Sequence, residues 1–69
     1  MTAREVVRVV ERLGFVFRRQ KGSHAIYRRS ADRARVVVPM HGGEVIRPGT
    51  LLGMLKDMGI TADEFRGLV

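Results

Sequence analysis

Three short runs of strand-forming residues, joined by turns of only a few residues, limit what this chain can fold into. The runs are Phe15–Gln20, His24–Arg29 and Ala34–Val38, and each is rich in β-branched or aromatic side chains. Lys21-Gly22-Ser23 and Ser30–Arg33 separate them and are typical of turns. Parallel strands need a crossover of roughly a dozen residues, which such turns cannot supply. The sequence therefore predicts an antiparallel meander of three strands.

Helical patterns flank these three runs. Thr2-Ala3-Arg4-Glu5 has the form of a capping box, and valines follow it at helical spacing, so a first helix is predicted over residues 3–13. A second helix is predicted from Pro48, which suits the first helical position, to Gly59, which stops it. Thr61-Ala62-Asp63-Glu64 is a second capping box and predicts a short final helix.

This order of elements predicts an α+β domain, in which helices lie on one face of a small three-stranded antiparallel sheet. With 69 residues, the chain is expected to form a single domain over residues 1–69 without a large cofactor pocket. It has no cysteine, which excludes disulfides, thiolate metal ligands and cysteine nucleophiles. No apolar run approaches the roughly 20 residues of a membrane helix, and the first residues lack a signal-peptide pattern. We therefore expect a cytoplasmic protein with no cofactor and no membrane partner.

Positive charge is concentrated in one part of the chain. The segment from Arg18 to Arg35 holds seven basic residues and one acid, Asp32, which equals the net charge of +6 of the whole protein. Such a surface attracts phosphate-rich partners, nucleic acid first and anionic membranes second. Exposed arginines on small strands also aid solubility and protect sheet edges, which accounts for some of them. The other basic residues are too closely spaced for this explanation alone, and they indicate a functional basic surface.

His24 stands inside this basic segment, directly after the turn Lys21-Gly22-Ser23. Imidazole exchanges protons near neutral pH, and a glycine lets a ligand approach the backbone closely. RNA cleavage needs an acid or base near the 2′-hydroxyl or the leaving oxygen, and positive charge near the phosphate. Because RNA carries its own nucleophile, this chemistry needs no metal. A lone histidine beside a turn is more often an ordinary polar residue, so residue types alone leave both interpretations open.

The sequence does not decide which face of the second strand is buried. Strand alternation gives two faces, His24, Ile26 and Arg28 on one and Ala25, Tyr27 and Arg29 on the other. Each face has one large apolar residue, so periodicity does not distinguish them. The ring of Tyr27 could stack on a base, but packing against neighbouring side chains is favoured.

His41 is the other histidine, and it lies in the loop that follows Pro39. Two histidines could divide the acid and base roles, or could bind a metal with a third ligand. The nearby acids, Asp32 and Glu44, show no ligand spacing, and zinc usually takes three or four protein ligands. We therefore predict no metal site and favour a polar loop residue at His41.

Several motifs occur together in an order that is more specific than any of them alone. A basic strand leads into Gly22-Ser23-His24, a valine-rich strand ends in Val38-Pro39, and Pro48-Gly49-Thr50-Leu51 opens a leucine-rich helix. Leu13-Gly14-Phe15 separates the first helix from the first strand. In this combination the chain resembles the HicA toxins of bacterial toxin–antitoxin pairs. The resemblance covers nearly the whole chain, up to Gly59-Ile60.

The resemblance implies a fold like a double-stranded-RNA-binding domain and a metal-independent mRNA endonuclease that arrests growth by blocking translation. It also implies a HicB-type antitoxin that binds the toxin and covers its active site. The catalytic histidine of the family corresponds to His24. Many relatives have a second histidine directly after it, and here that position is Ala25.

We therefore predict a ribonuclease toxin with His24 as the catalytic acid or base and mRNA as its substrate. The predicted RNA-binding residues around it are Lys21, Gly22, Ser23, Arg18, Arg19, Arg28 and Arg29. One alternative is a non-catalytic RNA-binding module of the same fold, because fold does not determine function. Another is an interaction domain whose basic surface meets an acidic protein.

Overall fold

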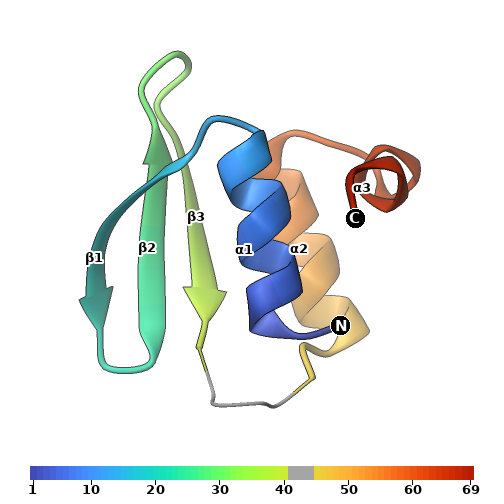
Figure 1. Ribbon diagram of the computed structural model, residues 1–69, viewed down its shortest axis with the longest axis horizontal. Coiled ribbons are helices and arrows are strands. Elements are labelled where there is room, and N and C mark those ends of the chain that lie inside the picture. The colour runs from blue at the N-terminus through green and yellow to red at the C-terminus, as the bar shows by residue number, and fades with distance from the viewer. Residues whose placement is uncertain (41–44) are drawn as a thin grey trace.

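The computed structural model describes residues 1–40 and 45–69. The prediction that His41 is a polar loop residue concerns a position outside these described residues. Figure 1 shows six elements, which are α1 (Ala3–Arg12), β1 (Val16–Lys21), β2 (His24–Arg29), β3 (Ala34–Pro39), α2 (Pro48–Met58) and α3 (Ala62–Leu68). The predicted α-β-β-β-α order with a short C-terminal helix is therefore confirmed. It is the order that the resemblance to a double-stranded-RNA-binding domain implied.

The sheet has the order β1-β2-β3, and both neighbouring pairs are antiparallel, as predicted. Gly22 and Ser23 connect β1 to β2, with Gly22 at a φ of +59°, as is usual for the first residue of a two-residue hairpin. The first strand was predicted to begin at Phe15 but begins one residue later. Phe15 is instead buried and belongs to the core.

Local sequence signals account for the helix ends. In the first capping box, the Thr2 hydroxyl accepts a hydrogen bond from the Glu5 amide, and the Glu5 carboxylate accepts one from the Thr2 amide. The hydrogen bonds that this carboxylate accepts from the Thr2 amide and the Thr2 hydroxyl lower the pKa of Glu5. The Thr61–Glu64 capping box is formed in the same way. Gly59 ends α2 in the left-handed conformation, with a φ of +79°.

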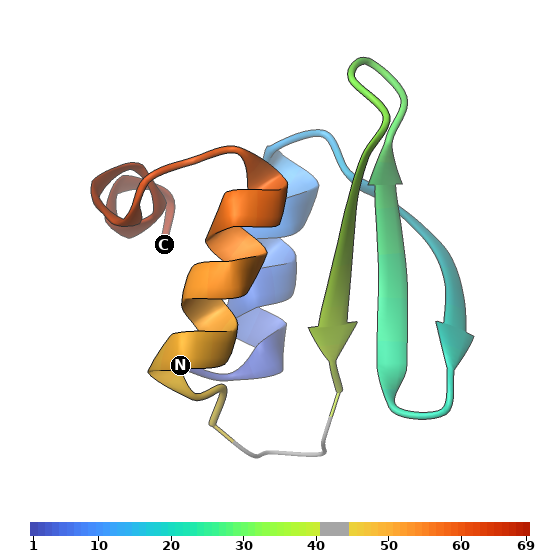
Figure 2. The same cartoon turned by 180° about the vertical axis from the view of Figure 1, so that it is seen from behind.

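One face of the sheet packs against the helical layer. The side chains that join the core from the sheet are Ala25 and Tyr27 of β2 and Val36 and Val38 of β3. The helices contribute Val6, Val9 and Val10 of α1 and Met54, Leu55 and Met58 of α2. Helix α3 packs through Phe65 against the helical layer, on the side away from the sheet, and β1 is the strand farthest from the helices (Figures 1 and 2). The prediction that helices lie on one face of the sheet is confirmed.

The Arg29 side chain joins three segments that are far apart in the sequence. Its guanidinium donates hydrogen bonds to the backbone carbonyls of Leu13 at 2.9 Å and Met58 at 3.2 Å. It also lies over the Phe15 ring, 4.4 Å from the ring centre, and forms a two-pronged ion pair with Asp32. Arg29 therefore connects the ends of α1 and α2 to the turn between β2 and β3.

We predict that Arg29→Ala lowers the free energy of unfolding by about 2 kcal/mol or more, because two partly buried carbonyls lose a charged donor. Arg28→Gln is the matched control, since Arg28 is the adjacent residue of β2, its side chain is exposed, and glutamine keeps most of the apolar stem. The control is expected to stay within about 0.5 kcal/mol of the original protein. Urea unfolding followed by circular dichroism measures both, and equal effects of the two substitutions would contradict the role assigned to Arg29.

Asp32 is expected to make stability depend on pH in the acid range. Its hydrogen bonds from Arg29 lower the pKa of the carboxyl from its ordinary value of 3.8 to about 2. Its contribution is therefore fully present above the unfolded-state pKa and is lost as the pH falls towards the folded-state pKa. We predict that Asp32→Asn makes the free energy of unfolding depend less on pH between the folded-state and unfolded-state pKa values of Asp32. The urea midpoint, measured as a function of pH, tests this. Asp57→Asn, which removes an exposed carboxylate of α2, is the control and should leave the curve's shape unchanged.

Candidate nucleic-acid interface

The hairpin between β1 and β2 holds His24 at one end of the sheet. His24 is the first residue of β2 and lies between Lys21 of β1 and Pro39 of β3 in the register. The Gln20 side chain donates a hydrogen bond to the Gly22 carbonyl at 3.1 Å. A backbone hydrogen bond of 2.6 Å from Met40 to Ser23 ties the turn to the end of β3. Gln20 was not among the predicted site residues, because nothing in the sequence marks its side chain as the one that supports the turn.

The core decides the question that periodicity left open. Because Ala25 and Tyr27 belong to the core, the alternating residues His24, Ile26 and Arg28 lie on the face opposite the helices. Tyr27 is buried and its ring makes an edge-to-face contact with Phe17, with 5.6 Å between the ring centres. The favoured prediction that Tyr27 packs rather than stacks on a base is confirmed.

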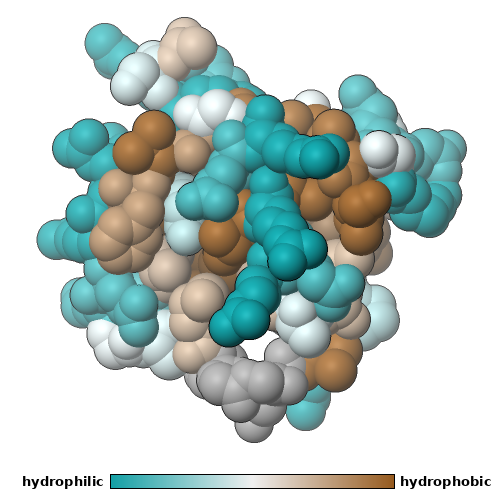
Figure 3. Space-filling view, in the orientation of Figure 1, coloured by the Kyte–Doolittle hydropathy of each residue, from teal (hydrophilic) through white to brown (hydrophobic). Residues whose placement is uncertain are grey.

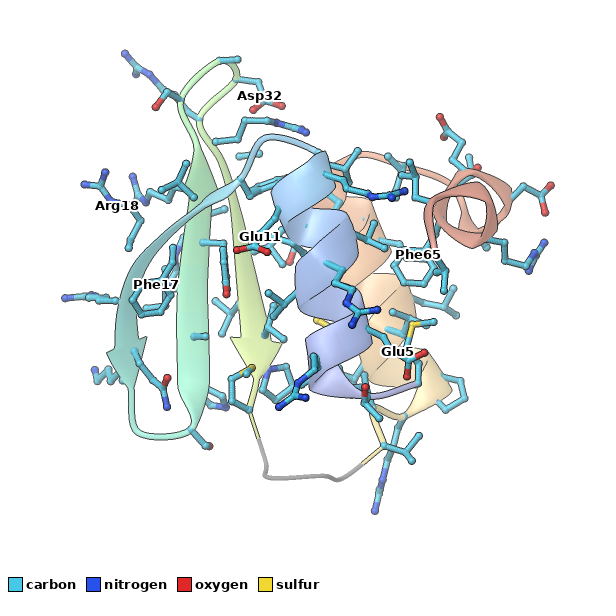
Figure 4. All side chains as sticks on the ribbon, viewed as in Figure 1. Glu5, Glu11, Phe17, Arg18, Asp32 and Phe65 are labelled. Carbon is cyan, nitrogen blue, oxygen red and sulfur yellow. The ribbon has the colours of Figure 1, made fainter. Side chains whose placement is uncertain are left out.

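A β-bulge in β1 brings two neighbouring arginines to the same face. Phe17 pairs with Tyr27 and Arg19 pairs with Ile26, so Arg18 is the extra residue between them. In a regular strand Arg18 and Arg19 would point to opposite faces, but in the bulge both stand opposite Ile26. Figure 4 shows the Arg18 side chain directed away from the helices.

The register now defines a surface that we call the open face. It consists of Val16, Arg18, Arg19 and Lys21 of β1, His24, Ile26 and Arg28 of β2, and Arg35, Val37 and Pro39 of β3. Four predicted RNA-binding residues, Lys21, Arg18, Arg19 and Arg28, therefore share one face with His24. Gly22 and Ser23 form the turn at its end. Arg35 also lies there, although it was not among the predicted site residues, because its place depends on pairing with Arg28.

Within the described residues, the arginines of the open face and Lys21 form no ion pair with a carboxylate. The ion pairs in this part of the chain are Arg29–Asp32 and Arg66–Asp63, and neither includes a cation of the open face. Asp32, the one acid of the basic segment, is already bound by Arg29. All the arginines of this face and Lys21 are exposed, so their charge is available to an anionic partner. Figure 3 shows hydrophilic side chains along the outer edge of the sheet, over β1.

Arg29 is the predicted RNA-binding residue that the structure separates from His24. It lies at the opposite end of β2, on the core side of the strand, and four of its N–H groups donate to Leu13, Met58 and Asp32. The hydrogen bond with Asp32 raises the pKa of Arg29 further above its ordinary value. Its side chain is committed to holding the fold, so we leave it out of the RNA-binding set proposed below.

A second surface feature lies on the other side of the helical layer. It is an apolar groove of about 560 Å³ between α2 and α3, lined by Met1, Pro48, Leu51, Leu52, Leu55, Ala62, Phe65, Arg66 and Val69. The one charged side chain among them is Arg66, which is paired with Asp63. This groove offers apolar contact but no acid–base group, so we place the candidate chemistry on the open face.

The described residues offer neither a cluster of metal ligands nor a membrane-spanning helix. Within residues 1–40 and 45–69, no group of three or more histidine, cysteine, aspartate or glutamate side chains is arranged to hold a metal ion. In the same part of the chain, no helix has the length and apolar character needed to cross a membrane.

Comparison with protein families gives the relationship of this chain. The family model described as the HicA toxin of bacterial toxin–antitoxin systems matches residues 3–60. The chain belongs to the HicA toxin family. The HicA match begins at the start of α1 and ends just after α2, so it includes the whole sheet and the open face, whereas α3 lies beyond it. A search of curated proteins found no match.

In this HicA-family protein we predict that Gly22→Ala lowers the free energy of unfolding by about 1 kcal/mol, because alanine is strained at a φ of +59°. The space around the added methyl group is open, so the cost comes from the backbone alone. Gly53→Ala is the matched control, in the interior of α2 and also without a close neighbour. It should raise stability by roughly 0.5–1 kcal/mol through helix propensity. Thermal unfolding distinguishes the two, and a stabilising Gly22→Ala would contradict the assignment.

Proposed function

We propose that this HicA-family toxin is an mRNA endoribonuclease in which His24 is the catalytic acid or base. The observation that carries the proposal is that His24 shares the open face with exposed cations that no carboxylate of the described residues neutralises. The chemistry needs no metal, because the 2′-hydroxyl of RNA is the nucleophile. The RNA-binding residues that we propose around His24 are Lys21, Gly22, Ser23, Arg18, Arg19 and Arg28.

The proposed reaction is an internal transfer at phosphorus. The 2′-oxygen bonds to phosphorus, the bond to the 5′-oxygen breaks, and a 2′,3′-cyclic phosphate and a 5′-hydroxyl are formed. One proton leaves the 2′-hydroxyl and one reaches the 5′-oxygen, and His24 serves at least one of these transfers. Lys21 lies directly opposite His24 on the neighbouring strand, where its ammonium group can offset the charge that develops on the phosphate.

A toxin of this kind needs a partner that restrains it. We propose a HicB-type antitoxin that covers the His24 surface, in keeping with the family's place in toxin–antitoxin systems. The charge of the open face favours a partner that presents carboxylates there. Cleavage of mRNA would block translation, which places the action of the toxin in the cytoplasm.

We predict that purified protein cleaves a defined single-stranded RNA in EDTA and that His24→Ala lowers the rate by about 10²–10⁴-fold or more, the usual contribution of a positioned acid–base group. The measurement is end-group analysis of the products, and cyclic phosphate ends are expected. Circular dichroism should show an unchanged fold, because the His24 side chain is exposed.

His41→Ala is the matched control, since it removes the other histidine of the chain. Retained cleavage in this variant assigns the proton transfers to His24, whereas loss in both variants would divide them between the two histidines. If His24→Ala cleaves as fast as the original protein, His24 is not catalytic. If neither the original protein nor His24→Ala cleaves RNA but both bind it, the chain is a non-catalytic RNA-binding module.

A further inference from the structure

Arg28 and Arg35 lie directly opposite each other on the open face. They are register partners of β2 and β3, and both side chains are exposed. Directly opposed side chains in an antiparallel pair have β-carbons about 4.5–5.5 Å apart, and like charges in this position repel. Neither guanidinium forms an ion pair within the described residues. The sheet therefore holds two cations close together without an internal anion between them.

Ile26, which lies next to Arg28 on the open face, limits the positions that the Arg28 and Arg35 side chains can take. Ile26 is only 6% exposed, yet it lies outside the core cluster and on the open face. Side chains of its own face must therefore cover it, and the long stems of arginine can do so while their charged ends stay in water. Arg28 is two residues along the same strand, on the same face as Ile26. The guanidinium groups consequently lie at the surface, where a ligand can reach them.

We propose that Arg28 and Arg35 together bind one phosphate of the RNA chain, at a position separate from the bond that His24 cleaves. This inference rests on the proposed function, because it places a second phosphate on the substrate of the same face. Guanidinium groups bind phosphate oxygens with paired N–H donors, and two of them on adjacent strands can share one tetrahedral anion. Binding of that anion would also remove the repulsion between the two arginines.

The distance between this pair and His24 determines which phosphate is bound. His24 and Arg28 are four residues apart on one strand, which corresponds to about 13 Å at 3.3 Å per residue. An extended single strand covers such a distance in about two nucleotides. The phosphate held by Arg28 and Arg35 should therefore lie about two linkages from the cleaved bond, with Arg19 between the two positions in the register.

The first test is a binding measurement that does not depend on cleavage. A single-stranded RNA with 2′-O-methyl groups throughout lacks the nucleophile and remains intact. Arg28→Gln and Arg35→Gln should each weaken its binding by about 3- to 10-fold, and the double variant should be little weaker than either, because both lose the same phosphate. The log–log slope of affinity against salt should become shallower by roughly 0.7. Multiplied effects of the two substitutions would mean two independent contacts and would overturn the shared site.

The control for net charge is Arg4→Gln with Arg8→Gln, which removes two exposed cations from α1 and should leave binding nearly unchanged. The thermal midpoints of Arg28→Gln and Arg35→Gln should not fall, because each substitution removes one of two repelling charges. An equal loss of RNA affinity in the α1 control would reduce the pair to a general charge effect and would overturn the proposal.

The second test locates the phosphate. Neutral methylphosphonate linkages are placed one at a time along the 2′-O-methyl RNA, around the position that is cleaved in the unmodified RNA. One linkage, about two nucleotides from that position, should weaken binding to the original protein but have no effect in the double variant.

The outcomes of this test separate the arginine pair from the catalytic role of His24. If no linkage behaves in this way, the proposal fails even when His24-dependent cleavage is observed. If cleavage is absent but such a linkage exists in the bound RNA, the pair stands and the catalytic role of His24 fails. If the two substitutions weaken binding of an acidic partner protein and leave RNA binding unchanged, the pair belongs to a protein interface and the proposal is overturned.

Discussion

Tyr27 and Val36 lie opposite each other in the sheet, and together with Ala25 and Val38 they face the valines of α1 and the apolar side of α2. The position of every other functional group depends on this contact. Side chains alternate along a strand, so burial of Ala25 and Tyr27 turns His24 to the opposite face. Slipping the register of β2 by one residue would place His24 against the helices and Tyr27 in water. The apolar core therefore holds the candidate catalytic residue at the surface.

Arg28 and Arg29 are adjacent in the sequence, yet their different surroundings give them different roles. Arg29 points to the core side, where it binds two backbone carbonyls, the Phe15 ring and Asp32. Arg28 points to the open face and has no such partner in the described part of the chain. Because Arg29 binds the one acid of the basic segment, the charge of the open face is left for a ligand. The ion pair that stabilises the fold thus also preserves the basic surface.

The HicA family match covers the sheet and both helices that pack on it, and this is the part of the molecule that builds the open face. The apolar groove between α2 and α3 lies on the other side of the helical layer and has no acid–base group. The two surfaces are chemically distinct, since one is cationic and the other is apolar. The proposed RNA cleavage and its restraint by an antitoxin both concern the cationic one.

Sequence alone was sufficient for features that depend on neighbouring residues. The capping boxes at Thr2 and Thr61, the turn at Gly22 and the stop at Gly59 act within a few residues, and each was found where it was predicted. The concentration of basic residues around His24 was likewise visible without a structure. These signals predicted the α+β order and the hairpin that holds His24.

Only the tertiary structure decided which residues share a face. Periodicity gave no choice between Ile26 and Tyr27 as the residue that faces the helices, and the contact with α1 and α2 made that choice. The bulge at Arg18, which sets Arg19 on the side of His24, depends on pairing with another strand. The structural role of Arg29 depends on Met58, 29 residues away in the chain. Contacts of this kind leave no local pattern in the sequence, because they form between segments that meet only when the helices cover the sheet.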